Sequence, residues 1–219
     1  MDLLIFDLDG TLIDSRLDLA NAVNAMRAHL GMSPLTNERV YTYVGNGAPL
    51  LVRRALGEKE GEQADEPLFA QALAFFMEYY GAHDVDCTTL YPGVHESLDR
   101  LRAAGKRMAV LTNKPDRMSR HILEVLGVAD YFLRIYGGNS FPQRKPNPIG
   151  VATLMRETGV DRTQTMMVGD SAVDVATARN AGIACCGVTY GFQPESLRDP
   201  APDLTVDRME QFADWLLKK

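Results

Sequence analysis

The chain has 219 residues, of which 46% are hydrophobic and 24% are charged, the balance of an ordinary globular protein. Its 23 basic and 29 acidic residues give a net charge of −6, which argues against a sequence-independent nucleic-acid binder or a protein held on acidic lipid, because both need a basic face. Three cysteines, two of them adjacent, do not form a disulfide framework, and no C-x-x-C pair for zinc is present. The sequence opens without the basic segment of a signal peptide and holds no apolar run of membrane-spanning length, so we expect a cytoplasmic protein with no nucleic-acid or membrane partner.

Short apolar runs along the chain predict buried β-strands, and they cover residues 3–6, 108–111, 166–168 and 183–188. Amphipathic helical patterns alternate with these runs, and each is followed by a glycine suited to end a helix: 94–101, 118–126 and 173–181. Strands that alternate with helices favour a parallel, doubly wound α/β sheet of Rossmann-like type, with helices on both faces.

One long stretch, residues 15–84, contains helical patterns but no strand pattern. It opens with Ser15-x-x-Asp18, which resembles a helix capping box, and helical segments then follow to about residue 84. We therefore expect residues 15–84 to form a small helical domain inserted after the first strand. Residues 1–14 and 85–219 then form the α/β core domain.

Polar residues gather where the predicted strands end, namely Asp7, Asp9, Thr112, Asn113, Asp170 and, four residues further on, Asp174. Lys145 lies between them along the chain, in a Lys-Pro segment. Ligands of open α/β sheets bind beyond the carboxyl ends of the strands, so these side chains are expected to converge on one edge. Each piece alone also fits an ordinary turn or helix cap. Their combination, in this order, favours a functional site.

The same residues carry a family resemblance. Residues 6–15, FDLDGTLIDS, resemble the first motif of the haloacid dehalogenase-like hydrolases. Thr112-Asn113 resembles their second motif, Lys145 their third, and residues 169–174, GDSAVD, their fourth. The helical insert of residues 15–84 stands where that family carries its cap domain. The resemblance covers nearly the whole chain.

Within this superfamily the closest likeness is to the phosphoglycolate phosphatases. It rests on residues 44–48, 51–56, 111–115, 137–138 and 189–191. Asn139 departs from the pattern, because such sequences often place Asp there, and we assign it no role from sequence. The resemblance implies a phosphatase that converts 2-phosphoglycolate to glycolate and phosphate.

The resemblance also implies a role for each catalytic residue. Asp7 attacks the phosphorus of a phosphomonoester and forms an aspartyl-phosphate, which water then hydrolyses. Asp9 protonates the departing alkoxide and later takes a proton from the water. Thr112 and Lys145 complete the catalytic group, and both bind the phosphoryl oxygens together with the backbone amide of Asn113.

Charge counting indicates that this chemistry needs a metal. With Asp9 protonated, Asp7, Asp170 and Asp174 carry three negative charges and Lys145 cancels only one, so a phosphate dianion is repelled. Oxygen-only ligands suit Mg²⁺ rather than zinc. By resemblance, Asp7 and Asp170 bind Mg²⁺ through their carboxylates and Asp9 through its backbone carbonyl. Asp174 belongs to the metal site by supporting the residues that bind the ion directly, or it orients Lys145.

In the predicted cap, the loop of Gly45, Asn46 and Gly47 is a candidate for substrate contact, because a glycine-flanked Asn can approach a small carboxylate. An ordinary turn explains the same residues equally well.

Several other functions remain open from sequence. A phosphatase for another small phosphoester, a pyrophosphatase or a sugar-phosphate mutase would share all four motifs. From a different class, a receiver-like domain is disfavoured because Thr112-Asn113 follows the strand where a phosphorylated Asp would be expected. A non-catalytic phosphate sensor is disfavoured because every catalytic position is filled. The expected partner is a small phosphomonoester, and a monomer and a homodimer are both compatible with the sequence.

Overall fold

The computed structural model describes residues 1–57 and 65–218, so residues 58–64 of the expected cap lie outside the described residues. The chain forms two compact units, Met1–Asp14 with Leu90–Lys219 and Ser15–Thr89. The second boundary follows residue 89 rather than residue 84. The reason is that the buried Asp18 carboxylate accepts hydrogen bonds from the N–H groups of Cys87 and Thr88, at 3.0 and 2.8 Å, and so holds the returning chain to the inserted unit.

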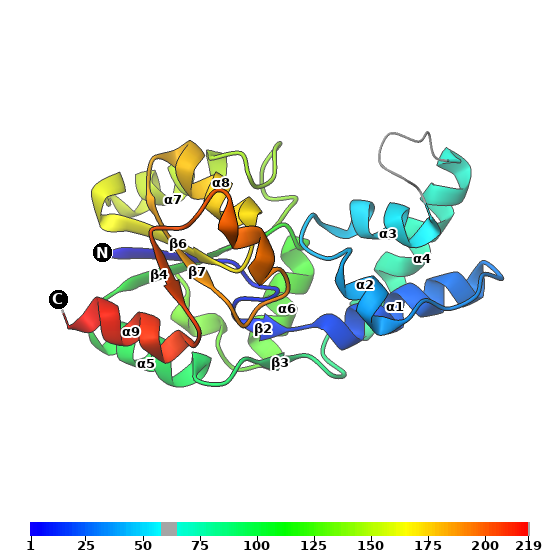
Figure 1. Cartoon of the computed structure of the whole chain (residues 1–219), viewed down its shortest axis with the longest axis horizontal. Helices are drawn as coiled ribbons and strands as arrows, with labels where there is room; N and C mark the ends of the chain where they lie inside the picture. The colour runs from blue at the N-terminus through cyan, green and yellow to red at the C-terminus, as the bar shows by residue number, and fades with distance from the viewer. Residues whose placement is uncertain (58–64, 219) are drawn as a thin grey trace. The chain divides into compact units, whose positions relative to one another are not determined.

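The first unit contains a six-stranded parallel sheet with the strand order β5-β4-β1-β6-β7-β8 (Figure 1). The strands are β1 (Leu3–Phe6), β4 (Arg107–Leu111), β5 (Arg134–Tyr136), β6 (Thr165–Gly169), β7 (Ala184–Val188) and β8 (Leu204–Val206). Every residue of β1 is buried, because its neighbours β4 and β6 flank it and helices cover both faces. The expected doubly wound α/β fold is confirmed.

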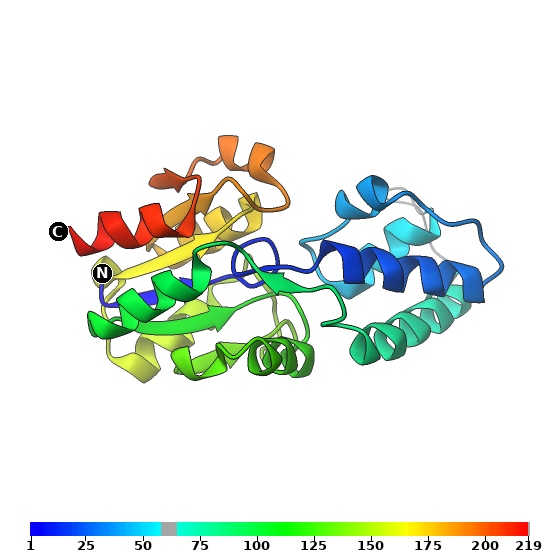
Figure 2. The same cartoon turned by 90° about the horizontal axis from the view of Figure 1, so that it is seen from below.

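Helices α7 (Ile149–Thr158) and α8 (Ala172–Ala181) cover one face of this sheet, and α5 (Val94–Ala103) and α9 (Met209–Leu217) cover the other. Figure 2 looks onto the face that carries α5 and α9. Helix α6 (Asp116–Val125) joins β4 to β5 and lies on the α5 face by the right-handed rule for such crossovers. Alternate residues of β1 point to opposite layers: Ile5 packs in the cluster with α7 and α8, whereas the Phe6 ring meets Phe212 of α9 edge to face.

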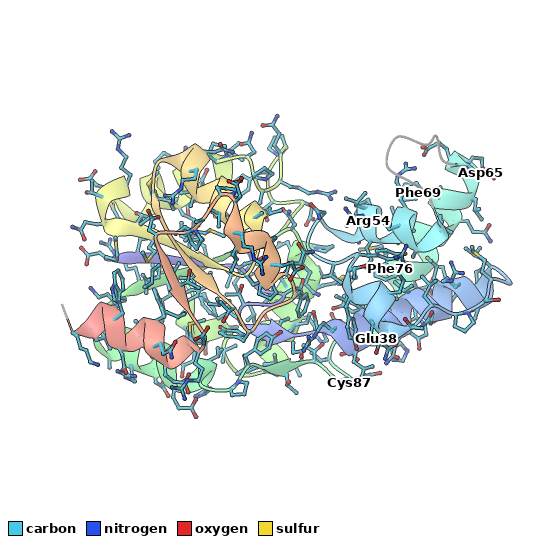
Figure 3. The ribbon with its side chains drawn as sticks, viewed as in Figure 1. Glu38, Arg54, Asp65, Phe69, Phe76 and Cys87 are labelled. Atoms are coloured by element: carbon cyan, nitrogen blue, oxygen red, sulfur yellow. The ribbon has the colours of Figure 1, made fainter. Side chains whose placement is uncertain are left out.

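The inserted unit is helical, as its pattern predicts, and comprises α1 (Arg16–His29), α2 (Asn37–Tyr41), α3 (Ala48–Leu56) and α4 (Glu66–Ala82). Figure 3 labels side chains of this unit, among them the buried Phe76 and the ring of Phe69, over which the Arg53 guanidinium lies at 3.8 Å. The predicted capping box at the start of α1 is wrong, because Ser15 gives the helix no side-chain cap and Asp18 binds the returning chain.

Two short strands, β2 (Ile13–Asp14) and β3 (Thr89–Leu90), pair where the chain leaves the first unit and returns to it. Just beyond them, the N–H of Tyr91 donates to the carbonyl of Leu12 at 3.0 Å. In the described part of the chain, no helix has both the length and the apolar character needed to cross a membrane.

Candidate active site

The candidate site lies at the carboxyl ends of the central strands. Asp7 directly follows β1, Thr112 follows β4, and Asp170 follows β6. The strand ladder continues past these ends, because the N–H of Asp7 donates to Val168 at 2.9 Å and the N–H of Thr112 donates to Tyr136 at 3.0 Å. The backbones of the two residues are therefore fixed by the sheet itself.

Lys145 links two of the predicted carboxylates. Its Nζ lies 2.9 Å from Oδ1 of Asp7 and 2.7 Å from Oδ1 of Asp174, and the side chains of Lys145 and Asp174 are only 2% and 0% exposed. Burial lowers the pKa of Lys145, but the neighbouring Asp174 and Asp7 carboxylates outweigh it and raise the pKa above its ordinary value. Lys145 is therefore a fixed positive charge in the site.

Asp174 has both carboxylate oxygens engaged. While Oδ1 accepts from Lys145, Oδ2 accepts from the Ser171 N–H at 3.2 Å and from the Ser171 hydroxyl at 2.7 Å, which forms a capping box at the start of α8. A Cβ on Gly169 would lie 2.2 Å from Cγ of Asp174, so only glycine fits beside it. The arrangement fixes Asp174 as the support of Lys145.

Asp170 is held by backbone from two loops. The N–H of Phe192 donates to Oδ2 of Asp170 at 2.6 Å. A Cβ on Gly10, whose φ is +81°, would lie 2.2 Å from the same oxygen, and one on Gly191 would lie 2.3 Å from Cβ of Asp170. Both glycines are therefore required for the close approach of these loops to the carboxylate.

Three carboxylates meet closely enough to bind one metal ion. Ligand oxygens of Asp7, Asp170 and Asp174 lie within 4.8 Å of one another. Burial raises the pKa of Asp7 to about 6, with Lys145 opposing and Asp174 adding to the shift. Burial, followed by Asp174 and Asp7, raises the pKa of Asp170 well above its ordinary value. One lysine thus leaves negative charge uncompensated, and a set of oxygen donors with excess negative charge fits a hard divalent cation.

Asp9 forms a separate pair with a lysine that the sequence did not single out. Nζ of Lys114 lies 3.0 Å from Oδ1 and 3.3 Å from Oδ2 of Asp9, and the side chains of Lys114 and Asp9 are 3% and 15% exposed. The only available sign in the sequence is its position, immediately after Thr112-Asn113. The predicted contact of the Asp9 carbonyl with a metal stays a prediction.

Thr112 and Asn113 organise the loop beyond β4. Oγ1 of Thr112 accepts from the N–H of Lys114 at 3.2 Å, and Nδ2 of Asn113 donates to the carbonyl of Lys145 at 3.2 Å. The Asn113 side chain therefore ties this loop to the segment that carries Lys145. Asn139, to which no role was assigned, accepts the N–H of Asp116 at 2.8 Å and supports the first turn of α6.

The remaining predicted residues belong to the inserted unit. Gly45, Asn46 and Gly47 end the loop between α2 and α3, and both glycines have positive φ, +115° and +86°. Gly47 is the residue that precedes α3 as its N-cap. The conformation requires the two glycines, while substrate contact by this loop stays a prediction.

Comparison with known proteins gives one consistent result. Residues 4–188 match the family model described as haloacid dehalogenase-like hydrolase. Phosphoglycolate phosphatase from Chromobacterium violaceum is 43% identical over 211 residues, which are 96% of this chain and 94% of that protein. Phosphoglycolate phosphatase from Vibrio vulnificus is 42% identical over 219 residues, which cover 98% of this chain and 96% of that protein. The crystal structure of a predicted phosphoglycolate phosphatase from Haemophilus somnus superposes with a TM-score of 0.90 at 35% identity, covering 100% of this chain and 97% of that one.

Proposed function

The chain belongs to the haloacid dehalogenase-like hydrolases, and we propose that it is a Mg²⁺-dependent phosphatase that hydrolyses 2-phosphoglycolate to glycolate and phosphate. The observation that carries this proposal is the buried group of Asp7, Lys145, Asp170 and Asp174 at the carboxyl edge of the sheet. The substrate is suggested by relatives at 42–43% identity that bear the name phosphoglycolate phosphatase.

Asp7 is the nucleophile in this proposal. Its Oδ1 accepts from the Leu8 N–H at 2.7 Å and lies 2.9 Å from Nζ of Lys145, which fixes the plane of the carboxylate. We assign the attack to the other oxygen, Oδ2. A bond forms from Oδ2 to phosphorus as the bond from phosphorus to the ester oxygen breaks, giving an aspartyl-phosphate.

Asp9 handles the protons. It gives a proton to the departing alkoxide, so that the leaving group departs as an alcohol, and then takes a proton from the water that attacks the aspartyl-phosphate. The second step releases phosphate and restores the carboxylate of Asp7. Asp9 suits this role because it lies two residues beyond Asp7 on the same loop and its carboxylate is held by Lys114.

The phosphoryl oxygens are bound by Lys145, the Thr112 hydroxyl and the backbone amide of Asn113 in this proposal. Asp174 holds Lys145 in position through the 2.7 Å contact. The carboxylates of Asp7 and Asp170 and the carbonyl of Asp9 would hold Mg²⁺, which when bound supplies positive charge for the transferring phosphoryl group. The cap loop of Gly45–Gly47 is proposed to discriminate among leaving groups.

A panel of small phosphomonoesters, assayed with and without Mg²⁺, tests the proposal. We expect 2-phosphoglycolate to give the highest kcat/KM, with activity lost in EDTA and restored by Mg²⁺. Faster hydrolysis of pyrophosphate or of another small phosphoester, or isomerisation of a sugar phosphate, would assign the same site to one of the alternative activities. Folded, Mg²⁺-loaded protein that leaves every ester intact would contradict a phosphatase altogether.

A further inference from the structure

Lys114 is a second buried lysine at the active edge, and the reaction described above gives it no task beyond its pair with Asp9. Its side chain is 3% exposed, and its Nζ contacts both oxygens of Asp9 at 3.0 and 3.3 Å. The loop that carries it is fixed, because its N–H donates to Oγ1 of Thr112 and its carbonyl accepts from the N–H of Gly138 at 2.8 Å. The ammonium group is therefore held at one place beside the acid of the reaction.

That place is where the leaving group must lie. Asp9 transfers its proton to the ester oxygen of the substrate, so this oxygen comes within hydrogen-bond reach of the Asp9 carboxylate. In 2-phosphoglycolate the carboxylate carbon is two covalent bonds from the same oxygen. The substrate carboxylate is consequently brought to the neighbourhood of Asp9 and of the lysine that contacts it.

The charge of this neighbourhood decides what can bind there. Once Asp9 has given its proton to the ester oxygen, it is a second carboxylate beside that of the leaving group, and the two repel unless a cation lies between them. Lys145 shows how one ammonium in this site serves two carboxylates, at 2.9 Å from Asp7 and 2.7 Å from Asp174. Lys114 stands in the corresponding relation to Asp9.

We infer that Lys114 is the specificity residue for the substrate carboxylate: its ammonium bridges Asp9 and the carboxylate of the leaving group. The inference rests on the proposed function and assigns the site to phosphomonoesters whose alcohol carries a carboxylate next to the ester carbon. It distinguishes the two lysines of the edge, since Lys145 serves the phosphoryl end of the substrate and Lys114 serves the other end.

The test compares two esters of nearly equal shape, 2-phosphoglycolate and the phosphate ester of glycolamide, which lacks the negative charge. Lys114→Gln keeps an N–H donor for Asp9 but removes the positive charge, and Lys114→Met removes both. We expect the ratio of kcat/KM for 2-phosphoglycolate to kcat/KM for the amide to fall at least about tenfold in both variants, mainly through KM, as expected when a charged hydrogen bond is lost.

The matched control is Lys106→Met, at the opposite end of β4, which should leave the ratio unchanged. Equilibrium binding gives an independent readout: in an Asp7→Asn background, calorimetry should show the same loss of preference when Lys114→Gln is added. Melting curves confirm folding, and Lys114→Gln carries the test if Lys114→Met does not fold.

An unchanged ratio in folded Lys114→Gln would overturn the inference, whether both activities fall equally or neither does, because the lysine would then act only through Asp9 or not at all. Wild-type protein that hydrolyses both esters with equal kcat/KM would overturn the inference while leaving the proposed function standing. Wild-type protein that hydrolyses neither ester would overturn the proposed function, and the inference with it.

Discussion

The two ends of the sheet carry the same residue types in opposite environments. At the amino end, Asp2 precedes β1 and Lys106 precedes β4, and the pair is 3.4 Å apart with 55% and 20% of the side chains exposed. At the carboxyl end, Asp9 and Lys114 follow the same two strands, 3.0 Å apart and 15% and 3% exposed. An exposed ion pair contributes about 0–1 kcal/mol to stability. Burying charges costs free energy of desolvation, and buried ionisable groups with strongly shifted pKa values cluster at functional sites. Burial, rather than residue type, distinguishes the end of the sheet that carries the candidate site from the opposite end.

The largest contrast is expected from Asp7→Asn and Asp2→Asn, which change one aspartate at each end of β1. Asp7→Asn should lower kcat for 2-phosphoglycolate at least about a thousandfold, because an amide cannot form the aspartyl-phosphate. Asp2→Asn should leave kcat within about twofold, as a surface change away from the site. Steady-state kinetics on both purified variants measure this, and normal turnover by folded Asp7→Asn would exclude Asp7 as the nucleophile.

Removing one carboxylate of the acidic group should act on metal affinity. Asp170→Asn is expected to raise the Mg²⁺ concentration for half-maximal activity at least about tenfold, since it removes a charged oxygen from the proposed metal site. Titration with Mg²⁺ after EDTA dialysis gives the value, and Asp2→Asn serves as the control of equal charge change. Full activity of demonstrably metal-free wild type would show that the charge count is wrong.

The raised pKa of Asp7 should make the stability of the protein depend on pH. The folded-state pKa of Asp7 is about 6, above its ordinary value of 3.8, so the folded protein binds this proton more tightly than the unfolded chain. The stabilisation from Asp7 is complete below pH 3.8 and is lost as the pH rises through 6. Metal-free wild type should therefore lose on the order of a few degrees in Tm between pH 4 and 7 relative to Asp7→Asn.

Saturating Mg²⁺ at pH 7 should recover part of that difference, because the cation replaces the proton as the partner of Asp7. Thermal melts at matched ionic strength measure both effects. A parallel pH dependence of wild type and Asp7→Asn would contradict the raised pKa.

The smallest effect is expected at the amino end. Lys106→Met breaks the exposed pair with Asp2 and should change the free energy of unfolding by about 0.5 kcal/mol or less. Urea titration measures it, with Asp2→Asn as the reciprocal variant. A loss of several kcal/mol would show that the exposed pair supports the fold, and the contrast between the two ends would then fail.

The central strands were predictable because burial on both faces gives each a continuous apolar run, as in β1 and β6. The edge strands β5 and β8 have only three residues each and expose Arg134 and Thr205, so their apolar pattern is too short to stand out. The capping-box prediction failed for a different reason. The partner of Asp18 is 69 residues away in Cys87, a distance that local pattern reading does not cover.

The residues of the candidate site likewise divide into those that the sequence predicts and those that it does not. Asp7 and Asp170 directly follow apolar runs, so topology alone brings them to one edge, and Lys145 was found through its motif. Phe192 was beyond reach because it acts through its backbone N–H, for which any residue but proline would serve. Lys114 lies within the matched residues 111–115 but received no role from sequence, since its identity does not reveal that the side chain turns inward to Asp9.

The hydrogen bond between Leu12 and Tyr91 has an evolutionary consequence. The chain leaves the sheet unit and returns to it at adjacent points. A segment inserted between these points therefore adds almost no strain to the sheet unit and only a small entropic cost of loop closure. The insert can be shortened, enlarged or replaced by an unrelated domain without displacing the strand ends that carry the candidate site. Such a junction lets the insert change without moving the strands of the sheet unit, and it marks the place at which a transplanted module should be joined.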